Sequence, residues 1–294
     1  MHQPTAQPCY GAFGCIMKGG GMVSRRVVLG GGLASLTLAG CGGQQPVARR
    51  GGDVYIDHPP TGPTGLDAVI DISHGVAVTD FAAVRRSGIL GVIHKATEGG
   101  DWTDGSYAVR QPQAERAGLL WGAYHFGTRQ YPGAQQAQLF LSVVRPTPST
   151  LIALDLEPND GNPRNTMTLP QAEAFVATVQ QATGRLPVLY THPQWANGQV
   201  YGRRRLSLGQ PIQPGSLLAR CELWLADYRE NPEIPYAWAD RGWKLWQYAA
   251  NQTETDVAYG SHTRAVAGVA YCDRNLFAGD ATALYRFWNS RARS

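Results

Sequence analysis

The fold is decided by residues 151–157, which read Leu151-Ile152-Ala153-Leu154-Asp155-Leu156-Glu157. This apolar run is bounded by Pro148 and by the turn-forming residues 158–161, and it is typical of a buried strand. Residues two apart on a strand point to the same face, roughly 6–7 Å apart, so we expect Asp155 and Glu157 to share one pocket. Two carboxyl groups in an apolar frame are costly to bury. The pair indicates either acid–base chemistry or a strand end where both groups are solvated or paired with arginine.

Seven further apolar runs predict strands on either side of this one, with helical stretches between the earlier runs. The eight predicted strands are 66–73, 91–98, 120–126, 151–157, 186–192, 223–228, 243–249 and 268–275. The predicted helices are 79–87, 105–117, 133–144, 168–183, a less regular one within 193–206, and a final one at 280–290. Thr168 and Gln171 have the spacing of a capping box, and Gly184 suits the end of that helix.

The pattern predicts an α/β fold, a modified TIM-like barrel of the form (β/α)5(β)3, because helices follow only the first five of the eight strands. In such barrels, chemistry collects at the C-terminal ends of the strands. Polar or aromatic residues end every predicted strand. In chain order these ends contain Asp71-Ile72-Ser73-His74, Lys95-Ala96-Thr97-Glu98, Tyr124-His125-Phe126, Asp155 with Glu157, Tyr190-Thr191-His192, Asp227-Tyr228, Gln247-Tyr248 and Asp273-Arg274-Asn275.

The first forty residues are typical of an export signal and not of a folded unit. A twin-arginine-like pair, Arg25-Arg26, precedes an apolar run that is too short for a stable membrane-spanning helix. The run ends in Leu38-Ala39-Gly40-Cys41, which resembles a bacterial lipobox. We expect translation from Met22, lipid on Cys41 and a membrane-bound mature protein, at the outer membrane if the bacterium has two membranes. An ordinary cleaved signal with a chance cysteine is the alternative.

Composition divides the rest of the chain into a tether and one catalytic domain. Residues 41–65 are rich in Gly, Pro, Gln and Arg without apolar periodicity, which predicts a flexible tether before a barrel at 66–294. The chain has 26 Lys and Arg against 22 Asp and Glu, and three of the basic residues lie in the first forty. The remainder is close to neutral, which argues against binding to nucleic acid. We expect a monomer.

Cysteine and metal motifs give little support to other chemistries. Cys221 and Cys272 belong to an exported chain and can either pair or remain two buried thiols. The sequence has no Cys-x-x-Cys, His-Glu-x-x-His, Gly-x-Ser-x-Gly or phosphate-binding loop, so we expect no metal and no cofactor.

Taken in order, the strand-end segments resemble family 25 of the glycoside hydrolases, the N-acetylmuramidase lysozymes of bacteria and their phages. The resemblance covers roughly residues 66–279. Its segments are Asp71-Ile72-Ser73-His74, Lys95-Ala96-Thr97-Glu98-Gly99, Gly122-Ala123-Tyr124-His125-Phe126, Leu154-Asp155-Leu156-Glu157, Leu189-Tyr190-Thr191, Leu223-Trp224-Leu225-Ala226-Asp227-Tyr228, Trp246-Gln247-Tyr248 and Asp273-Arg274-Asn275. The sugar contacts of the loop after Asp71 are in doubt, because the Gln-Gly and Ile-Asp-Trp elements usual in the family are missing there.

The resemblance implies cleavage of the β-1,4 bond between N-acetylmuramic acid and N-acetylglucosamine in peptidoglycan. It implies that Glu157 is the general acid and Asp155 a stabiliser of the reacting centre, with Asp71 and Asp273 completing an acidic pocket. The Asp-x-Glu pattern favours attack by the substrate's own acetamide oxygen, with attack by a protein nucleophile or by a positioned water as the alternatives. Four carboxyl groups so close would share protons and titrate together.

Other residues of the predicted pocket have two readings. Sugar-facing positions are expected for Tyr124, Tyr190, Tyr228, Trp246 and Gln247, although several aromatic residues must belong to the core. Lys95 and Glu98 form either a buried ion pair or a contact to sugar or stem peptide. His125 faces either the barrel or the helix layer, as a substrate contact or a structural residue.

Two other functions remain open on the sequence alone. The first is a non-catalytic, lipid-tethered protein that binds peptidoglycan, and the second is a barrel hydrolase of another amino-sugar polymer such as chitin. Retention of both Asp155 and Glu157 argues against the first.

Overall fold

A computed structural model of the chain describes residues 65–202, 204–250, 265–270 and 272–289. The predicted export signal, the lipidation site at Cys41 and the tether up to residue 64 lie outside these residues. Within the described ranges, no helix is long and apolar enough to cross a membrane.

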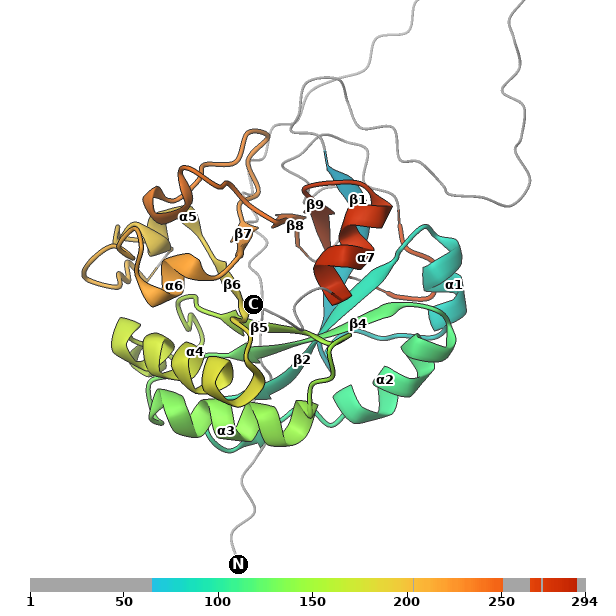
Figure 1. Cartoon of the computed structure of the whole chain (residues 1–294), viewed down its shortest axis with the longest axis horizontal. Helices are drawn as coiled ribbons and strands as arrows, with labels where there is room; N and C mark the ends of the chain where they lie inside the picture. The colour runs from blue at the N-terminus through green and yellow to red at the C-terminus, as the bar shows by residue number, and fades with distance from the viewer. Residues whose placement is uncertain (1–64, 203, 251–264, 271, 290–294) are drawn as a thin grey trace, which may run out of the picture.

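Eight strands form a closed barrel, in which β1 pairs with β2 on one side and with β9 on the other. Figure 1 shows the strands at the centre, with helices around part of the circumference. The barrel strands are β1 (Leu66–Ile72), β2 (Gly91–Glu98), β4 (Leu120–Phe126), β5 (Leu151–Asp155), β6 (Val188–Thr191), β7 (Leu223–Ala226), β8 (Leu245–Ala249) and β9 (Asp273–Phe277). The predicted α/β barrel of eight strands is confirmed.

The last barrel strand differs from the prediction in position and direction. A strand was expected at 268–275 with Asp273 near its C-terminal end, but β9 begins at Asp273 and runs antiparallel to both β8 and β1. The polar ends of the other strands lie at their C-termini, whereas Asp273 lies at the N-terminus of β9. Because β9 is reversed, Asp273 still reaches the same rim, where it is the register partner of Asp71.

A short ninth strand was not predicted. β3 (Trp102–Thr103) pairs antiparallel with the end of β2, so that Glu98 lies opposite Trp102. The hairpin extends β2 beyond the barrel wall and brings Trp102 to the rim.

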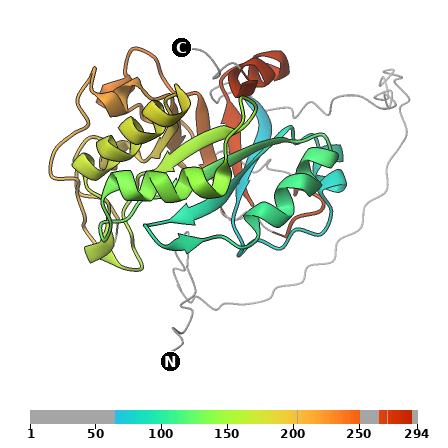
Figure 2. The same ribbon diagram turned by 60° about the horizontal axis from the view of Figure 1, so that its bottom comes forward.

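Helices follow each of the first five barrel strands, as predicted. These are α1 (Phe81–Arg86), α2 (Tyr107–Arg116), α3 (Gly133–Val144), α4 (Leu169–Thr183) and the single-turn α5 (Pro193–Ala196). The capping box of Thr168 and Gln171 begins α4, and Gly184 ends it with a φ of 69°, a conformation that costs glycine little. α3 and α4 lie side by side against the barrel (Figure 2).

Two further helices complete the fold. The single-turn α6 (Leu217–Arg220), which was not predicted, precedes β7, and α7 (Ala281–Asn289) follows β9. Trp288 of α7 is fully buried, and its ring lies 2.8 Å from the position of a Cβ atom built on Gly91, at the start of β2. α7 therefore closes the end of the barrel at which the parallel strands begin.

Strand alternation separates two apolar layers. On β5, Leu151 and Ala153 belong to the interior cluster, and Ile152 and Leu154 pack outward against the helix layer. Continuing this alternation points Asp155 inward, at the end of the barrel opposite α7. The apolar pattern thus puts the carboxyl group in the pocket.

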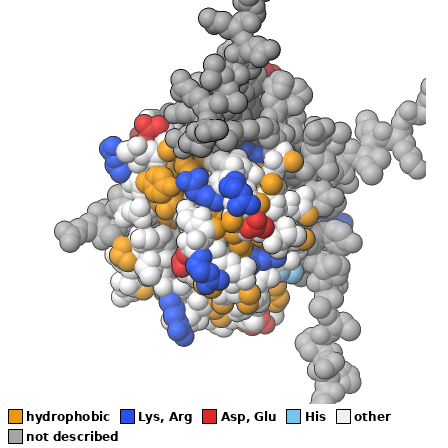
Figure 3. Space-filling model, turned by 90° about the vertical axis from the view of Figure 1, so that its right-hand side faces the viewer, with side chains coloured by type: hydrophobic (Ala, Val, Ile, Leu, Met, Phe, Trp, Pro, Cys, Tyr) orange, Lys and Arg blue, Asp and Glu red, His pale blue; other side chains and the backbone are white. Residues whose placement is uncertain are grey.

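Two features of the remaining side chains bear on the predictions. Cys221 and Cys272 are both buried thiols and do not form the disulfide that was one of the two alternatives. On the face that includes α1, basic side chains are scattered among hydrophobic and uncharged ones (Figure 3).

Candidate active site

The pair Asp155 and Glu157 lies at the C-terminal end of β5. Leu156, between them, is fully buried in the outer layer, so the two carboxyl groups turn toward the pocket. Asp155 is 7% exposed, and its Oδ1 has no hydrogen-bond partner among the described residues. Burial, and then the charge of Glu157, raise the pKa of Asp155 well above its usual value. The Glu157 side chain is more open, at 27% exposure.

Asp71, at the same rim on β1, is held by two side-chain amides. Gln247 Nε2 lies 3.1 and 3.0 Å from its two oxygens, and Asn275 Nδ2 lies 2.8 Å from Oδ2. Burial raises the pKa of Asp71 to about 6, although the bonds from these amides and from Asp273 oppose the rise. A hydrogen bond between the Asp71 and Asp273 carboxyl groups requires a proton on one of them. The two carboxyl groups can therefore share one proton.

Aromatic donors fix the orientation of both amides. Trp224 Nε1, which can only donate, lies 2.6 Å from Asn275 Oδ1, so the Asn275 nitrogen must face Asp71. Tyr190 and Tyr228 donate to Gln247 Oε1 at 2.9 and 2.8 Å. Burial raises the pKa of both tyrosines well above the usual value, which keeps the hydroxyl protons in place.

Tyr124, on β4, completes the inner wall. Its ring meets the Trp224 ring edge-on at 6.3 Å. Burial, followed by the charge of Asp155, raises the Tyr124 pKa well above its usual value. The predicted residues Tyr124, Tyr190, Tyr228 and Gln247 thus lie together around the four carboxyl groups.

Lys95 and Glu98 form an ion pair at the rim, with Lys95 Nζ 2.6 Å from Glu98 Oε2. The ammonium also lies 5.1 Å from the Trp102 ring centre and 4.9 Å from that of Phe126, both within cation–π range. Of the two predicted readings, the ion pair is present.

Trp246 was predicted to contact sugar, and this prediction is wrong. Trp246 is fully buried in the outer layer, where its Nε1 donates to the Asp227 carbonyl oxygen at 2.5 Å. On β8, Gln247 points into the barrel, so its neighbour Trp246 must point outward. Both residues had been predicted to contact sugar because they lie next to each other at one predicted strand end.

His125 also faces outward and is structural. Its ring stacks on Phe175 at 4.8 Å, and its two nitrogens lie 2.7 Å from Thr97 Oγ1 and 3.0 Å from Gln136 Oε1. Burial lowers the pKa of His125 to about 3, so the ring is neutral. It belongs to the packing of β4 against α3 and α4.

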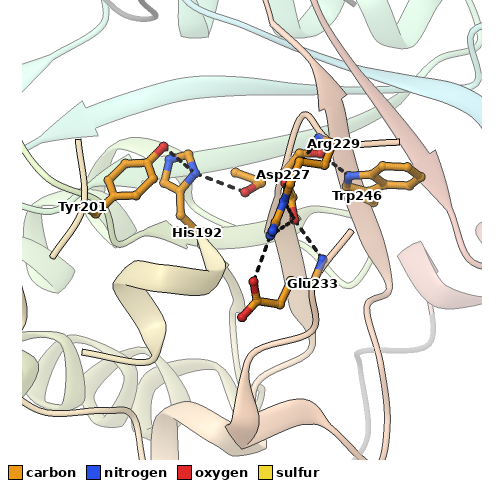
Figure 4. Close-up of polar contacts among 7 residues, drawn as sticks. His192, Tyr201, Asp227, Arg229, Glu233 and Trp246 are labelled. Carbon is orange, nitrogen blue, oxygen red and sulfur yellow. Dashed lines mark hydrogen bonds and ion pairs between the residues drawn. The ribbon is translucent and has the colours of Figure 1, made fainter. Parts of the chain in front are cut away.

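His192 lies at a predicted strand end without a predicted role, and the structure places it against the pair. Its Nε2 lies 3.1 Å from Glu157 Oε2, and its ring stacks on Tyr201 at 4.5 Å. Figure 4 shows His192 beside Tyr201, and Asp227 with Arg229 and Glu233 on the neighbouring β7 side. The sequence signal that could have identified His192 is its position directly after Thr191, at the same rim as the other strand ends.

The arrangement suits acid catalysis at an acetal or ester centre. One rim carries an open carboxyl group, a buried carboxyl group with a raised pKa, and tyrosine and amide donors. Among the described residues, no three His, Cys, Asp or Glu side chains are grouped so that they could hold a metal ion. The side chains at this rim can transfer protons and stabilise developing charge.

Comparison with known proteins points to one family. Residues 70–257 match the family described as Glycosyl hydrolases family 25. Lysozyme M1 of Streptomyces globisporus is 27% identical over 250 residues, which are 80% of this chain and 76% of that protein. The solved bacterial lysozyme of Streptomyces coelicolor has a TM-score of 0.62 and 27% identity over 78% of this chain and 99% of its own. A family GH25 lysozyme from Aspergillus fumigatus has a TM-score of 0.59 and 27% identity, covering 79% and 100%.

Proposed function

The chain belongs to family 25 of the glycosyl hydrolases, and from this we propose that it is a muramidase acting on peptidoglycan. The bond cleaved is the β-1,4 linkage between N-acetylmuramic acid and N-acetylglucosamine. The observation that carries the proposal is the meeting of Asp71, Asp155, Glu157 and Asp273 at one rim of the barrel. Three strands far apart in the sequence supply these carboxyl groups.

We assign the proton donor to Glu157. Its carboxyl group is the more open of the pair on β5, so it can reach the glycosidic oxygen, whereas Asp155 is buried below it. Proton transfer from Glu157 to that oxygen lets the bond to the sugar's C1 break, with the electron pair leaving on the oxygen.

We propose that the acetamide oxygen of N-acetylmuramic acid attacks C1 as this bond breaks. The ring formed carries positive charge and an N–H group, and the Asp155 Oδ1, which lacks a partner, suits both. Water then opens the ring and returns a proton to Glu157. Asp71 and Asp273 complete the negative field. Gln247, with Tyr190 and Tyr228 bonded to it, holds Asp71 in place, and Tyr124 is the aromatic residue we propose to contact the sugar.

We propose that the protein is exported and held at the cell envelope by lipid on Cys41. The support lies in the sequence, in the Arg25-Arg26 pair and the Leu38-Ala39-Gly40-Cys41 motif. A tethered enzyme would act on the polymer at a high local concentration.

The test is digestion of purified sacculi by wild type and by Glu157→Gln. Mass spectrometry of borohydride-reduced products should show N-acetylmuramic acid at the new reducing ends, and Glu157→Gln should lower the rate at least about 100-fold. Glu173→Gln, an exposed glutamate on α4, is the matched control and should keep wild-type activity. N-acetylglucosamine at the reducing end would contradict the bond assignment, and full activity of Glu157→Gln would remove its role.

A further inference from the structure

Basic side chains gather at the end of the barrel where the parallel strands begin, the end that α7 packs across (Figure 1). Each of them lies in the last turn of a helix or in the segment that leads into the next strand. We call this surface the basic end, and its cations are Arg85, Arg116, Arg145, Arg185, Arg220, Arg241, Lys244 and Arg286. The unpaired acidic residues of the same surface are fewer: Glu115, Glu222, Asp240 and Asp280. The basic end therefore carries an excess of positive charge.

The barrel topology explains why these cations lie together. A helix that follows a parallel strand runs back along it, so α1, α2, α3 and α4 all end at this surface. Cations are favoured in the last turn of a helix, where backbone carbonyl groups lack partners. The opposite rim carries the four carboxyl groups of the pocket. The barrel is therefore positive at one end and negative at the other, and its field can orient it.

None of the cations at the basic end is neutralised by an ion pair among the described residues. The ion pairs of lysine and arginine there use other cations, at the rim, on α1 and within the barrel wall: Lys95, Arg229, Arg86 and Arg274. Arg116, Arg145 and Arg220 are exposed. Arg185 is buried, but it donates to the carbonyl oxygens of Pro148 and Thr150 and not to a carboxylate. The charge of the basic end is thus available to an external anion.

The chain enters the barrel at this same end. Gly65, which precedes β1, lies against the Trp243 ring and the backbone of Phe277, beside the start of β8 and the end of β9. Cys41, the proposed site of lipid attachment, is 24 residues earlier in the sequence. A coil of that length, which the composition predicts, spans roughly 25–30 Å. A lipid on Cys41 would therefore keep the bilayer within reach of the basic end.

We propose that the basic end is a docking surface for an anionic lipid bilayer, and that docking turns the rim with the four carboxyl groups toward the cell-wall polymer. Each Lys or Arg near an anionic bilayer is attracted to it, and salt screens the attraction beyond about 10 Å at 0.1 M. The contact orients a chain that lipid already holds, and a salt wash removes a chain without lipid. The inference rests on the proposed function in one respect, because lipid on Cys41 sets the side from which the membrane is met.

Two triple variants of equal charge change test the surface. The protein is residues 41–294 with Cys41→Ala, which keeps every described residue and carries no lipid. Arg116→Gln, Arg145→Gln and Arg220→Gln together remove three exposed cations from the basic end. Arg129→Gln, Arg164→Gln and Arg204→Gln together remove three exposed cations from loops that follow β4, β5 and β6, on the rim side, and form the matched control.

The measurement is sedimentation with vesicles of phosphatidylcholine, with or without about 30% phosphatidylglycerol. We expect the Cys41→Ala protein to sediment with the anionic vesicles at about 0.05 M salt, to remain free with the neutral ones, and to be released at about 0.5 M salt. The basic-end triple variant should lower the partition coefficient at least about tenfold, and the rim-side variant should change it by less than about twofold. The rate on soluble glycan strands should be the same with and without anionic vesicles, because the rim faces away from them.

Equal sedimentation with both kinds of vesicle, or an equal loss in the two triple variants, would overturn the inference. Inhibition by anionic vesicles would overturn the orientation, because it would place the rim against the bilayer. Charge-dependent binding to sacculi without binding to vesicles would assign the basic end to a wall polymer instead.

Thermal unfolding identifies a triple variant that folds poorly, and the comparison of the two kinds of vesicle with the Cys41→Ala protein alone then decides. Failures of the proposed function give different results. A protein that is inactive without vesicles contradicts the muramidase assignment, and a wild-type chain that takes up no palmitate contradicts the attachment at Cys41. Neither result changes the vesicle measurement.

Discussion

Asp155 and Asp71 are the same residue type at the same rim, yet their carboxyl groups have different surroundings. Asp71 accepts from two amides whose own oxygens are occupied by Trp224 and by tyrosines. Asp155 has an oxygen without any partner among the described residues. An unpaired buried acceptor costs folding free energy. Asp155 therefore lowers the stability of the folded chain, and its unpaired oxygen can interact with positive charge that develops on the substrate.

Asp155→Asn should be more stable than wild type at neutral pH and nearly inactive. Because the pKa of Asp155 is raised in the folded chain, its contribution to stability is fully present below the unfolded pKa of about 4 and is lost as pH rises through the folded value. The side-chain amide of Asp155→Asn does not ionise, so the variant avoids this loss of stability as pH rises. We expect a gain of about 1 kcal/mol at pH 7, or roughly 2–4 °C in Tm, and little gain at pH 4.

Thermal unfolding followed by circular dichroism at both pH values measures this effect. Muramidase activity should fall at least about 100-fold. Asp240→Asn, on an exposed loop, should change neither quantity. A variant that is less stable than wild type at pH 7 would show that the Asp155 charge is satisfied in the folded protein.

On the element β8, the alternation of side chains along the strand separates residues of the pocket from residues of the outer layer. Leu245 and Gln247 face the interior, while Trp246 and Tyr248 pack outward, with Tyr248 donating to the buried Asp67. The run Trp246-Gln247-Tyr248 contributes one residue to the pocket and two to the outer layer. Neighbouring residues of this motif therefore have different roles, because the strand turns them to opposite faces.

Trp246→Phe and Gln247→Leu should separate these roles. Trp246→Phe loses one hydrogen bond to Asp227 and should lower stability by about 1–2 kcal/mol, with kcat/KM within about twofold of wild type. Gln247→Leu, of similar size, removes the donor to Asp71 and the acceptor for two tyrosines, and should lower kcat at least about tenfold. Unfolding curves and sacculus kinetics on both variants check this. A raised KM in Trp246→Phe with unchanged stability would show that Trp246 contacts the substrate.

The whole molecule is closed by a strand that runs against its neighbours. β9 is antiparallel to β1 and β8, and its Arg274 forms a buried ion pair with Asp67 of β1, with Nη2 2.6 Å from Oδ2. Trp288 of α7 fills the opposite end of the barrel and donates to the Trp121 carbonyl oxygen. The barrel is thus closed at the end where α7 packs, and the last strand supplies Asp273 and Asn275 to the opposite rim.

The attachment proposed for the whole molecule predicts a simple fractionation result. Cys41→Ala should abolish incorporation of labelled palmitate and move the protein from the membrane fraction to the soluble one, because no lipid can be added. Activity on isolated sacculi should be unchanged. Cys221→Ala, which alters a thiol buried at the end of α6, should keep the label. Labelled Cys41→Ala protein would contradict lipidation at this residue.

The sequence by itself determined the elements and most of the chemistry. Apolar runs of strand length, the capping box before α4 and the polar ends of the strands are local signals, set by side-chain type and spacing. They were sufficient for the eight-strand barrel, which the structure confirms. The roles of Asp71, Asp155, Glu157 and Asp273 came from the resemblance to family 25 and stay predictions, as do the sugar contacts expected of Tyr124, Tyr190, Tyr228 and Gln247.

Only the tertiary structure decided the direction of β9, the burial of Trp246 and the outward face of His125. It also decided that Cys221 and Cys272 stay apart and that His192 meets Glu157. Each of these depends on which strands are neighbours and which way each one faces. That is settled by burying all the apolar faces at once around a closed barrel, and no single segment carries the information.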